Sequence, residues 1–372
     1  MRLSILFLLS SALSARAAVD FSHQIVPILR EHCAECHAGD KKKGGFSFND
    51  RKSLLEGSEN GAVVVAGKAG MSRMIEVILS TDSDEQMPPK GKRVPADQIA
   101  RFPKLKVVIR MGVGYDRVDR AACAARGIKV CNVPDYGTQE VAEFAVLMAL
   151  GLRRGLTLYH DTQRGPTPAK WAVMPHPAVR RQEVQTFGIL GLGRIGTAAA
   201  LRAKALGYRV VFYDPALPNG SDRAIGVTRC RTMDEMLAQA DVLSIHCPLT
   251  RKTRGLIGER ELRLLPKDAV VVNTARGPIL DIDALERVLR DGHIAAAGLD
   301  VIPVEPPVEP VPSLLQAYRN KEEWLAGRLI ITPHIAFHTP QAWDDIRLKS
   351  AETMRDVLVE GLNTNVIPPE SD

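Results

Sequence analysis

A glycine-rich turn limits the possible folds of this chain more than any other feature of its sequence. Gly191, Gly193 and Gly196 have the spacing G-x-G-x-x-G, after the apolar run 187–190 and before an alanine-rich stretch. Glycines at these places allow a tight turn, close approach of a pyrophosphate and close packing of helix on strand. The turn therefore predicts a βαβ unit with a dinucleotide at the helix N-terminus. A strand–helix turn without a ligand is the alternative.

Asp214 ends the next apolar run, 18 residues after Gly196. A carboxylate at this position accepts hydrogen bonds from the ribose hydroxyls and repels a 2′-phosphate. The sequence therefore predicts NAD, rather than NADP, as the cofactor.

Short runs rich in Val and Ile alternate with helical patterns over residues 101–372. Runs of this kind are typical of parallel strands that are buried on both faces. The expected strands are 106–110, 129–132, 184–190, 209–213, 242–246, 269–274, 294–299 and 329–332. The expected helices are 140–158, 197–206, 233–240 and 283–291, and the proline-rich segment 303–312 is expected to be a loop. The alternation predicts an α/β fold with a doubly wound parallel sheet, a Rossmann NAD-binding domain.

Three residues with acid–base or anion-binding side chains follow predicted strands. They are Arg276, Glu305 and His334. An arginine fork can grip a carboxylate and a keto oxygen, and a histidine supported by a glutamate can transfer the proton that accompanies a hydride. The alternatives are pairing of Arg276 with a surface acid, Glu309 in place of Glu305, and a capping role for His334.

The N-terminus has the pattern of an export signal. Arg2 precedes the apolar run 3–13, and the small residues of Ala-Arg-Ala-Ala follow. This predicts a signal peptide over residues 1–18 and a periplasmic or otherwise exported protein. An uncleaved buried helix or anchor is the alternative. Later in the chain no run of 18 apolar residues occurs, so no permanent membrane span is expected.

Cys33, Cys36 and His37 form the pattern C-x-x-C-H. The two thiols can bond the vinyl groups of a haem c, and the histidine can ligate its iron. Met87, in a loop before two prolines, is the expected second iron ligand, whereas Met71 and Met74 lie in less favourable contexts. A zinc half-site and a redox C-x-x-C pair are the alternatives. A haem c here predicts electron transfer with a redox partner.

Composition argues against direct binding of nucleic acid. The net charge is only +6, aromatic residues are 5% of the chain, and the one basic block is Lys41–Lys43. A small-molecule ligand is the better expectation for such a surface.

Two families resemble this chain. The segments DFSHQIVPIL, CAECH, KGGFSF and MPP make residues 19–100 similar to the planctomycete-type cytochrome c module, a small all-α haem domain. Residues 101–372 resemble the D-isomer-specific 2-hydroxyacid dehydrogenases, especially the branch of the carboxyl-terminal-binding-protein corepressors. The motifs that carry this likeness are RMGVGYD, GLGRIG, HCPLT, NTARG, DV-x-x-x-EP and TPH.

The second resemblance implies roles for particular residues. The family's catalytic Arg, Glu and His fall on Arg276, Glu305 and His334, and its substrate-carboxylate amides fall on Val113 and Gly114. Its cofactor contacts fall on Thr138, Arg194, Ile195, Asp214, Pro248, Thr253, Ala275 and Asp300, besides the glycine turn. The implied substrate is a 2-hydroxy or 2-keto acid, and the implied assembly is a homodimer through the helix 140–158.

The resemblance also implies a domain plan. An NAD-binding domain would span residues 138–333, and residues 101–137 and 334–372 would form a partial flavodoxin-like substrate lobe. Both family patterns are cut short at Ala100 and Arg101, with no Gly/Ser- or Pro-rich linker between them. This favours a chimeric gene model, and a fusion of two truncated parts is the alternative. In the chimeric case the dehydrogenase part would be cytoplasmic. Three functions are open: an NAD-dependent dehydrogenase, an electron-transfer haem protein, and an NAD-sensing binding protein without turnover.

Overall fold

The computed structural model describes residues 37–38, 46–47, 49–58, 63–64, 99–164 and 171–368. The chain divides into two compact units, Met1–Gly91 and Lys92–Asp372. The predicted signal peptide 1–18 and the residues Cys33, Cys36 and Met87 lie outside the described residues. Within the described part of the chain, no helix has the length and apolar character needed to cross a membrane.

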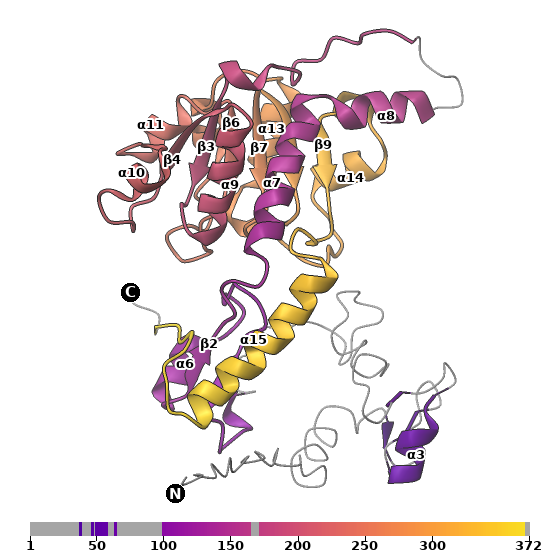
Figure 1. The fold of residues 1–372 in the computed structure, drawn as a ribbon. Helices are drawn as coiled ribbons and strands as arrows, with labels where there is room; N and C mark the ends of the chain where they lie inside the picture. Colours follow the sequence, from indigo (N-terminus) through magenta and orange to yellow (C-terminus); the bar gives the residue numbers. More distant parts are fainter. Residues whose placement is uncertain are drawn as a thin grey trace, which may run out of the picture. The chain divides into compact units, whose positions relative to one another are not determined.

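A seven-stranded parallel sheet forms the centre of the larger unit, in the order β5-β4-β3-β6-β7-β8-β9 (Figure 1). The strands β3, β6, β7 and β8 are buried at every position because they consist almost wholly of apolar residues. The strands are β3 Thr186–Leu190, β4 Arg209–Tyr213, β5 Thr228–Arg229, β6 Val242–Ile245, β7 Ala269–Asn273, β8 Ile294–Leu299 and β9 Leu329–Ile331.

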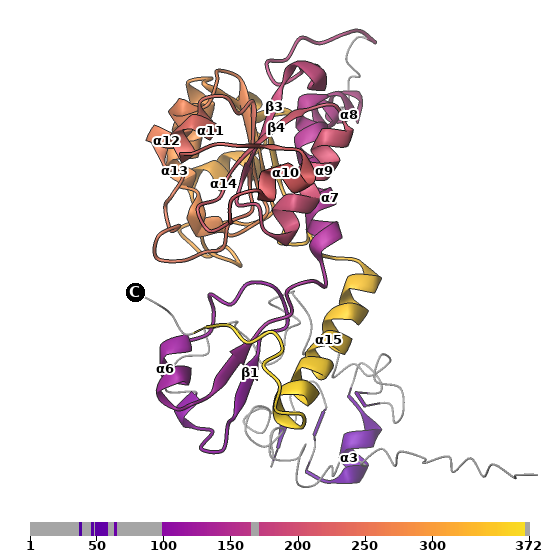
Figure 2. The ribbon, with the colours of Figure 1, turned by 60° about the vertical axis from the view of Figure 1, so that its left-hand side comes forward.

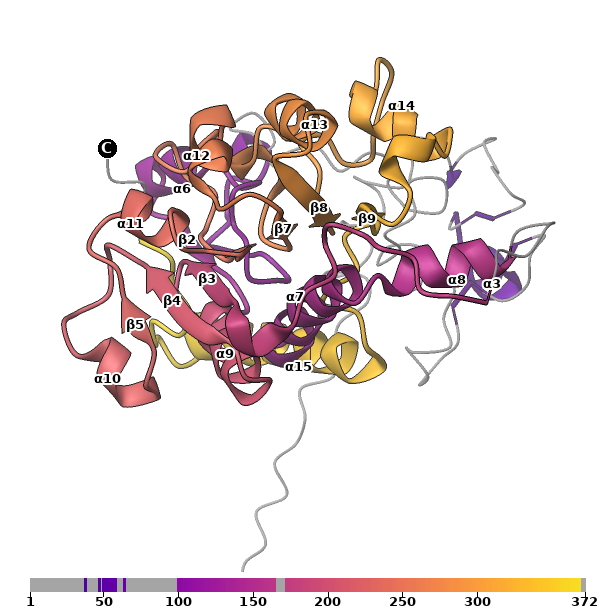
Figure 3. The ribbon, with the colours of Figure 1, turned by 90° about the horizontal axis from the view of Figure 1, so that it is seen from above.

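Helices cover both faces of this sheet, and each face has its own apolar core. One core contains side chains of α7 and α9, and the other contains side chains of α11, α12, α13 and α14. Figure 3 shows α7 and α9 on the side of the sheet opposite to α12 and α13. The arrangement confirms the predicted doubly wound α/β fold. The helices are α7 Thr138–Arg153, α8 Leu156–Arg164, α9 Arg194–Ala205, α10 Ser221–Ile225, α11 Met233–Leu237, α12 Glu259–Leu264, α13 Ile282–Arg290 and α14 Ser313–Arg319.

A second, smaller lobe precedes α7 in the sequence and is completed by the end of the chain (Figure 2). It contains β1 Val107–Ile109, α6 Arg120–Ala125 and β2 Lys129–Cys131, and the two strands are parallel. Helix α15 Pro340–Leu358 returns to this lobe, and Val366 then forms an antiparallel bridge with Cys131. The N–H of Ile367 donates to the carbonyl of Val130 at 2.8 Å. The far C-terminal segment therefore covers the outer edge of β2.

Some predicted elements differ from the structure. The helix expected over 140–158 is two helices, α7 and α8, because Gly155 between them has φ +61°. The helix expected over 233–240 ends at Leu237. The short strand β5 and the helix α15 were not expected from the sequence. The predicted domain boundaries stay predictions, although Thr138 does open α7 and His334 does follow β9.

The described part of the smaller unit contains one short helix, α3 Arg51–Glu56. Asp50 caps it, because its carboxylate accepts the N–H of Ser53 at 2.8 Å. Phe46, Leu54 and Val63 are buried together beside this helix.

Candidate functional site

The glycine turn lies at the carboxyl end of β3 and opens α9. Gly191 has φ +94°, and a Cβ added there would lie 2.7 Å from the backbone nitrogen of Cys247. A Cβ on Gly196 would lie 2.1 Å from the carbonyl oxygen of Gly191. Gly193 differs, because an added Cβ would meet nothing within 4 Å among the described residues. Two of the glycines are thus needed by the fold, and the third leaves open space at the N-terminus of α9.

Asp214, at the end of β4, holds this turn in place. Its Oδ2 accepts the N–H of Leu192 at 2.9 Å, and its Oδ1 accepts the N–H of Ala216 at 2.9 Å. The carboxylate is half-buried beside the glycine turn. It therefore lies where a ribose would follow a pyrophosphate bound at the turn.

The residues present fit a dinucleotide. Arg194 and Ile195 begin α9, and no side chain of the N-cap residue occupies the free N–H groups at that helix end. Thr138 begins α7, and its hydroxyl is buried without a hydrogen-bond partner among the described residues. An orphaned buried hydroxyl is a group that a ligand can satisfy.

The loops after β6 and β7 contain the other predicted cofactor contacts. The carbonyl of Pro248 accepts the hydroxyl of Thr253 at 2.6 Å, which closes the first loop. In the second loop, the N–H of Ala275 donates to the side chain of Asn273 at 3.0 Å. The amide of Asn273 also donates to the carbonyl of Arg276 at 3.0 Å. Asn273 had no predicted role, and the structure shows that it shapes the loop that carries Arg276.

His246 and Cys247, at the end of β6, are poor candidates for acid–base chemistry. Burial lowers the pKa of His246 to about 4 and raises the pKa of Cys247 to about 12. The imidazole and the thiol are therefore both neutral near pH 7.

His334 lies in the turn after β9 and pairs with Glu305. Its Nδ1 is 2.7 Å from Oε2 of Glu305, whose Oε1 accepts the N–H of Ile302 at 3.1 Å. Burial raises the pKa of Glu305, but the hydrogen bond and charge of His334 outweigh this and hold that pKa below its usual value. Glu309, the alternative glutamate, instead accepts the N–H of Val311. Because Nδ1 is occupied, Nε2 is the ring nitrogen left to exchange a proton.

Asp300 fixes the turn that carries His334. Its Oδ1 accepts the hydroxyl of Thr332 at 2.6 Å and the N–H of Ile335 at 2.9 Å, and its Oδ2 accepts the N–H of Ala336 at 2.9 Å. The main-chain carbonyl of Asp300 accepts the N–H of His334, which has φ +58°. The predicted contact of Asp300 with a cofactor stays a prediction, since its carboxylate here organises the turn.

Arg276 brings the two lobes together at the predicted substrate amides. Its Nε donates to Oδ1 of Asp116 at 2.8 Å, and both side chains are about one-fifth exposed. A Cβ added to Gly114 would lie 1.4 Å from Nη2 of Arg276. The guanidinium therefore packs directly on the backbone next to Val113 and Gly114. The sequence left open whether Arg276 pairs with an acid. The structure shows that it pairs with Asp116.

Two further arginines in this segment, Arg110 and Arg117, had no predicted role. Nη1 of Arg110 donates to the carbonyl of Met111, and an added Cβ on Gly112 would clash with the same guanidinium. Arg117 forms an ion pair with Oε2 of Glu305 at 3.7 Å. The only signal for these arginines in the sequence was their place in and beside the segment RMGVGYD.

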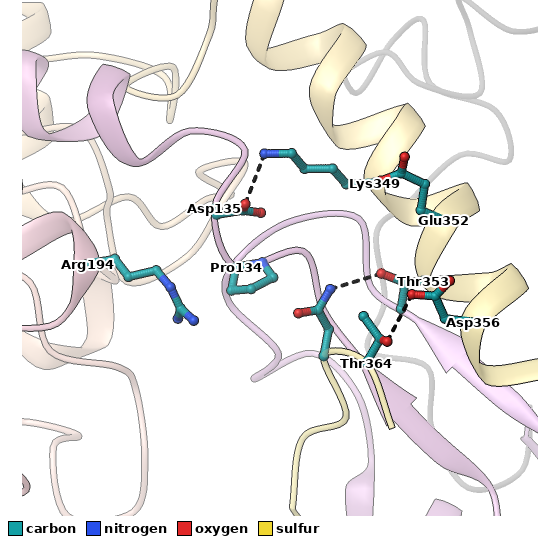
Figure 4. A pocket seen from close by; sticks show the side chains of 9 residues that line it. Pro134, Asp135, Arg194, Lys349, Glu352, Thr353, Asp356 and Thr364 are labelled. Atoms are coloured by element: carbon teal, nitrogen blue, oxygen red, sulfur yellow. Dashed lines mark hydrogen bonds and ion pairs between the residues drawn. The ribbon is translucent and has the colours of Figure 1, made fainter. Parts of the chain in front are cut away.

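A polar cavity of about 260 Å³ lies where the lobes are joined (Figure 4). Lys349 of α15 donates to Asp135 at 3.0 Å, and Asp135 belongs to the segment that leads into α7. Arg194 lines the same cavity. The two connections between the lobes are thus linked by a hydrogen-bonded ion pair beside the start of α9.

Residues 146–336 match the sequence profile of the D-isomer specific 2-hydroxyacid dehydrogenase, NAD binding domain. This region holds the glycine turn, Arg276, Glu305 and His334. The chain belongs to the D-isomer-specific 2-hydroxyacid dehydrogenases. Residues 33–91 match the profile of Planctomycete cytochrome C.

Relatives of this chain include a reductase and a dehydrogenase. A glyoxylate reductase of Aeropyrum pernix is 36% identical over 269 residues, which are 70% of this chain and 76% of the reductase. A D-3-phosphoglycerate dehydrogenase of Methanocaldococcus jannaschii is 34% identical over 319 residues, or 86% of this chain. This chain spans 57% of the length of that second relative.

Solved structures agree with the family assignment. The D-lactate dehydrogenase of Aquifex aeolicus, complexed with NAD and lactic acid, is 28% identical, with a TM-score of 0.63. The match covers 75% of this dehydrogenase and 85% of the Aquifex chain.

In the smaller unit, His37 contacts Phe46. Its Nδ1 lies 3.2 Å from the carbonyl oxygen of Phe46, and the two rings are 5.2 Å apart. The described part of the chain holds no cluster of three or more metal-binding side chains.

Proposed function

We propose that this chain is an NAD-dependent dehydrogenase that interconverts a 2-hydroxy acid and a 2-keto acid. The pair of His334 and Glu305, with 2.7 Å between Nδ1 and Oε2, carries the proposal. NAD, when bound, supplies the acceptor or donor of a hydride. Gly191, Gly193 and Gly196, the starts of α9 and α7, and Asp214 would hold it.

The chain's own residues would perform the rest of the reaction. Arg276 and the amides of Val113 and Gly114 would bind the substrate carboxylate, because the guanidinium already lies against that backbone. In the reducing direction, His334 would give the proton on Nε2 to the keto oxygen as a hydride reaches the second carbon. In the oxidising direction, it would take the hydroxyl proton. Glu305 would stabilise the imidazolium and keep its orientation.

Oxidation of NADH by a panel of 2-keto acids tests this proposal. We expect turnover with at least one of them and loss of turnover in Arg276→Ala. Absence of turnover across the panel, with NAD(H) still bound, would favour a corepressor-like binding protein instead. In that case NAD(H) should shift self-association of the protein.

We also propose that the smaller unit carries a haem c. A ligating histidine commonly donates its second ring nitrogen to a backbone carbonyl, and Nδ1 of His37 lies 3.2 Å from such a carbonyl. Cys33 and Cys36 would bind the haem covalently, and His37 and Met87 would ligate its iron. The haem would supply one-electron transfer to a redox partner. Covalent haem also requires export, in agreement with the predicted signal peptide.

Acid–acetone extraction tests the haem. A c-type spectrum that stays with the protein supports it, whereas extractable or absent haem contradicts it. The intact mass of the native protein adds a second reading, because removal of residues 1–18 and addition of one haem change the mass in opposite directions. The same mass shows whether a fusion with a shortened substrate lobe exists as one polypeptide.

We further propose that the dehydrogenase forms a homodimer through the α7 side of its larger lobe. Exposed apolar side chains occur on α7, on α8 and after α8: Leu147, Leu156, Trp171 and Val173. Trp171 is 93% exposed, which is unusual for a large aromatic residue unless a partner covers it. Sedimentation of the wild type and of Leu147→Glu should show a dimer that the charge disrupts.

A further inference from the structure

Three arginines lie on or against the segment after β1. Arg110 and Arg117 belong to this segment, and Arg276 comes from the larger lobe. The guanidinium of Arg110 packs on Gly112, that of Arg276 packs on Gly114, and that of Arg117 pairs with Glu305. In agreement with this geometry, the charges of Arg276 and Arg117 both lower the pKa of Arg110, after the larger effect of burial. Like charges at such a place indicate a binding site for anions.

The carboxylates nearby are already engaged. Asp116 accepts Nε of Arg276 at 2.8 Å. Glu305 accepts the N–H of Ile302 with one oxygen and contacts His334 with the other. Neither carboxylate is left to bind another guanidinium strongly.

Arg117 is the arginine that these contacts leave most available. Its Nη2 lies 3.7 Å from Oε2 of Glu305, which is an ion-pair distance but too long for a hydrogen bond. Its side chain is 51% exposed, and no hydrogen bond to another described residue is formed by it. Asp116, the residue before Arg117, pairs with Arg276, and this ion pair fixes the backbone at Arg117.

We propose that Arg117 binds a second anionic group of the substrate, at the end remote from the carboxylate that Arg276 binds. The preferred substrates are then 2-keto acids with a further carboxylate or a phosphate. This inference rests on the proposed dehydrogenase function and names the substrate class of the same site.

The arrangement of the residues supports this class. Arg276 lies against Gly114 on one side of the site, and Arg117 lies beside the Glu305 partner of His334. Val113 and Gly114 are only three to four residues before Arg117 in the same segment, so a substrate held at those amides by Arg276 would have Arg117 near its other end. A guanidinium fork matches carboxylate and phosphate oxygens alike, so the two sources share one chemistry.

Matched pairs of keto acids test the proposal. The pairs are 2-oxoglutarate with 2-oxopentanoate, and phosphohydroxypyruvate with hydroxypyruvate. The measured quantity is the ratio of kcat/KM for the dianionic acid to kcat/KM for the acid without the second group. We expect a ratio above one in the wild type, a fall of about 10- to 100-fold in Arg117→Gln, and an intermediate value in Arg117→Lys. The pair with the larger ratio identifies carboxylate or phosphate.

Arg120→Gln is the control variant. It removes the same charge from the same segment, but Nη1 of Arg120 donates to the carbonyl of Pro368, away from Glu305. Its ratio should equal that of the wild type.

Two results would overturn the proposal. One is an unchanged ratio in Arg117→Gln, and the other is an equal loss for both members of each pair, which would make Arg117 a positioning residue for Glu305. If no keto acid is turned over, the dehydrogenase proposal fails. Calorimetric titration of the NADH-loaded protein with the same acids then decides on Arg117. Tighter binding of the dianions that Arg117→Gln abolishes supports the anion site, and equal binding rejects it.

Discussion

Oε2 of Glu305 lies 2.7 Å from Nδ1 of His334, while Oε1 of the same carboxylate accepts the N–H of Ile302. The glutamate is therefore held by the backbone and in turn holds the imidazole. A histidine fixed in this way keeps one tautomer and one ring orientation. The proton for the reaction is then confined to Nε2.

Glu305→Gln should lower kcat by about 100- to 10,000-fold, because the imidazolium loses its anionic partner. The Kd for NADH should stay within a factor of two of the wild-type value. The contacts of Glu305 are with Ile302, His334 and Arg117 and not with the glycine turn. Steady-state kinetics and fluorescence titration of NADH measure the two quantities.

Glu309→Gln is the matched control, because Glu309 belongs to the same kind of Glu-Pro pair but contacts Val311. Its kcat should stay within twofold of the wild type. Equal losses in the two variants would show that the Glu305 contact with His334 has no special role.

Gly193→Ala should fold normally but bind NADH at least tenfold more weakly. The methyl group would meet no described residue within 4 Å, and it would fill the space at the start of α9 where a pyrophosphate approaches. Thermal unfolding should change by no more than about 2 °C.

Gly191→Ala is the comparison for fold stability. There the methyl group would lie 2.7 Å from the nitrogen of Cys247, and φ is +94°. We expect a clearly lower Tm. If Gly193→Ala binds NADH as the wild type does, the glycine turn does not hold the pyrophosphate.

Asp116→Asn should lower the free energy of unfolding by about 1–3 kcal/mol at pH 7, through the lost charged hydrogen bond to Arg276. Burial raises the pKa of Asp116, but the charge and hydrogen bond of Arg276 hold it below 3.8 in the folded protein. A lowered folded pKa means that the stabilisation is complete above about pH 4 and disappears as the pH falls through the folded value.

Urea unfolding of both proteins from pH 7 to pH 3 tests this pH dependence. The difference between wild type and variant should be constant down to about pH 5 and shrink below about pH 4. Asp344→Asn is the control, because Asp344 forms an ion pair with Arg347 and its side chain is 81% exposed. This variant should change the free energy of unfolding by less than about 1 kcal/mol at every pH from 7 to 3. A difference that grows on acidification would contradict the assignment.

Asp214→Asn should raise the ratio of kcat/KM for NADPH to that for NADH by about tenfold or more, because the charge that repels a 2′-phosphate is removed. The asparagine oxygen can still accept the N–H of Leu192, which holds the glycine turn, whereas the hydrogen bond from the N–H of Ala216 is lost. Asp222→Asn, in α10 beyond the same strand, should leave the ratio unchanged. A wild-type preference for NADPH would contradict the role given to Asp214.

The strands of the larger lobe could be predicted from the sequence because their short apolar runs are nearly uninterrupted and are bounded by polar turns. Only the two-residue strand β5 was too short to leave such a pattern. The break between α7 and α8 was missed because the apolar pattern continues through Gly155, whose positive φ ends the first helix. Helix α15 was missed as well, although Thr339 caps it and Pro340 begins it.

The pairing of Glu305 with His334 could be predicted from the residue types and their places after strands. The catalytic roles of these two residues and of Arg276 stay predictions. The other partners that hold these residues could not be predicted, because they come from distant parts of the chain. Asp116 is 160 residues from Arg276, and nothing local indicates that the two meet. The sequence also did not indicate that the buried carboxylate of Asp300 organises the turn of His334. Its contact with a cofactor stays a prediction.

The pairing of residues 365–367 with β2 has a consequence for the order in which the protein is made. Synthesis proceeds from the N-terminus, so the complete larger lobe leaves the ribosome before Val366 and Ile367 do. The small lobe, with the amides of Val113 and Gly114, gains this strand-like contact from a segment that emerges after the whole larger lobe. A ribosome stalled just before residue 365 would therefore hold a finished NAD-binding lobe beside a small lobe whose sheet edge is still open.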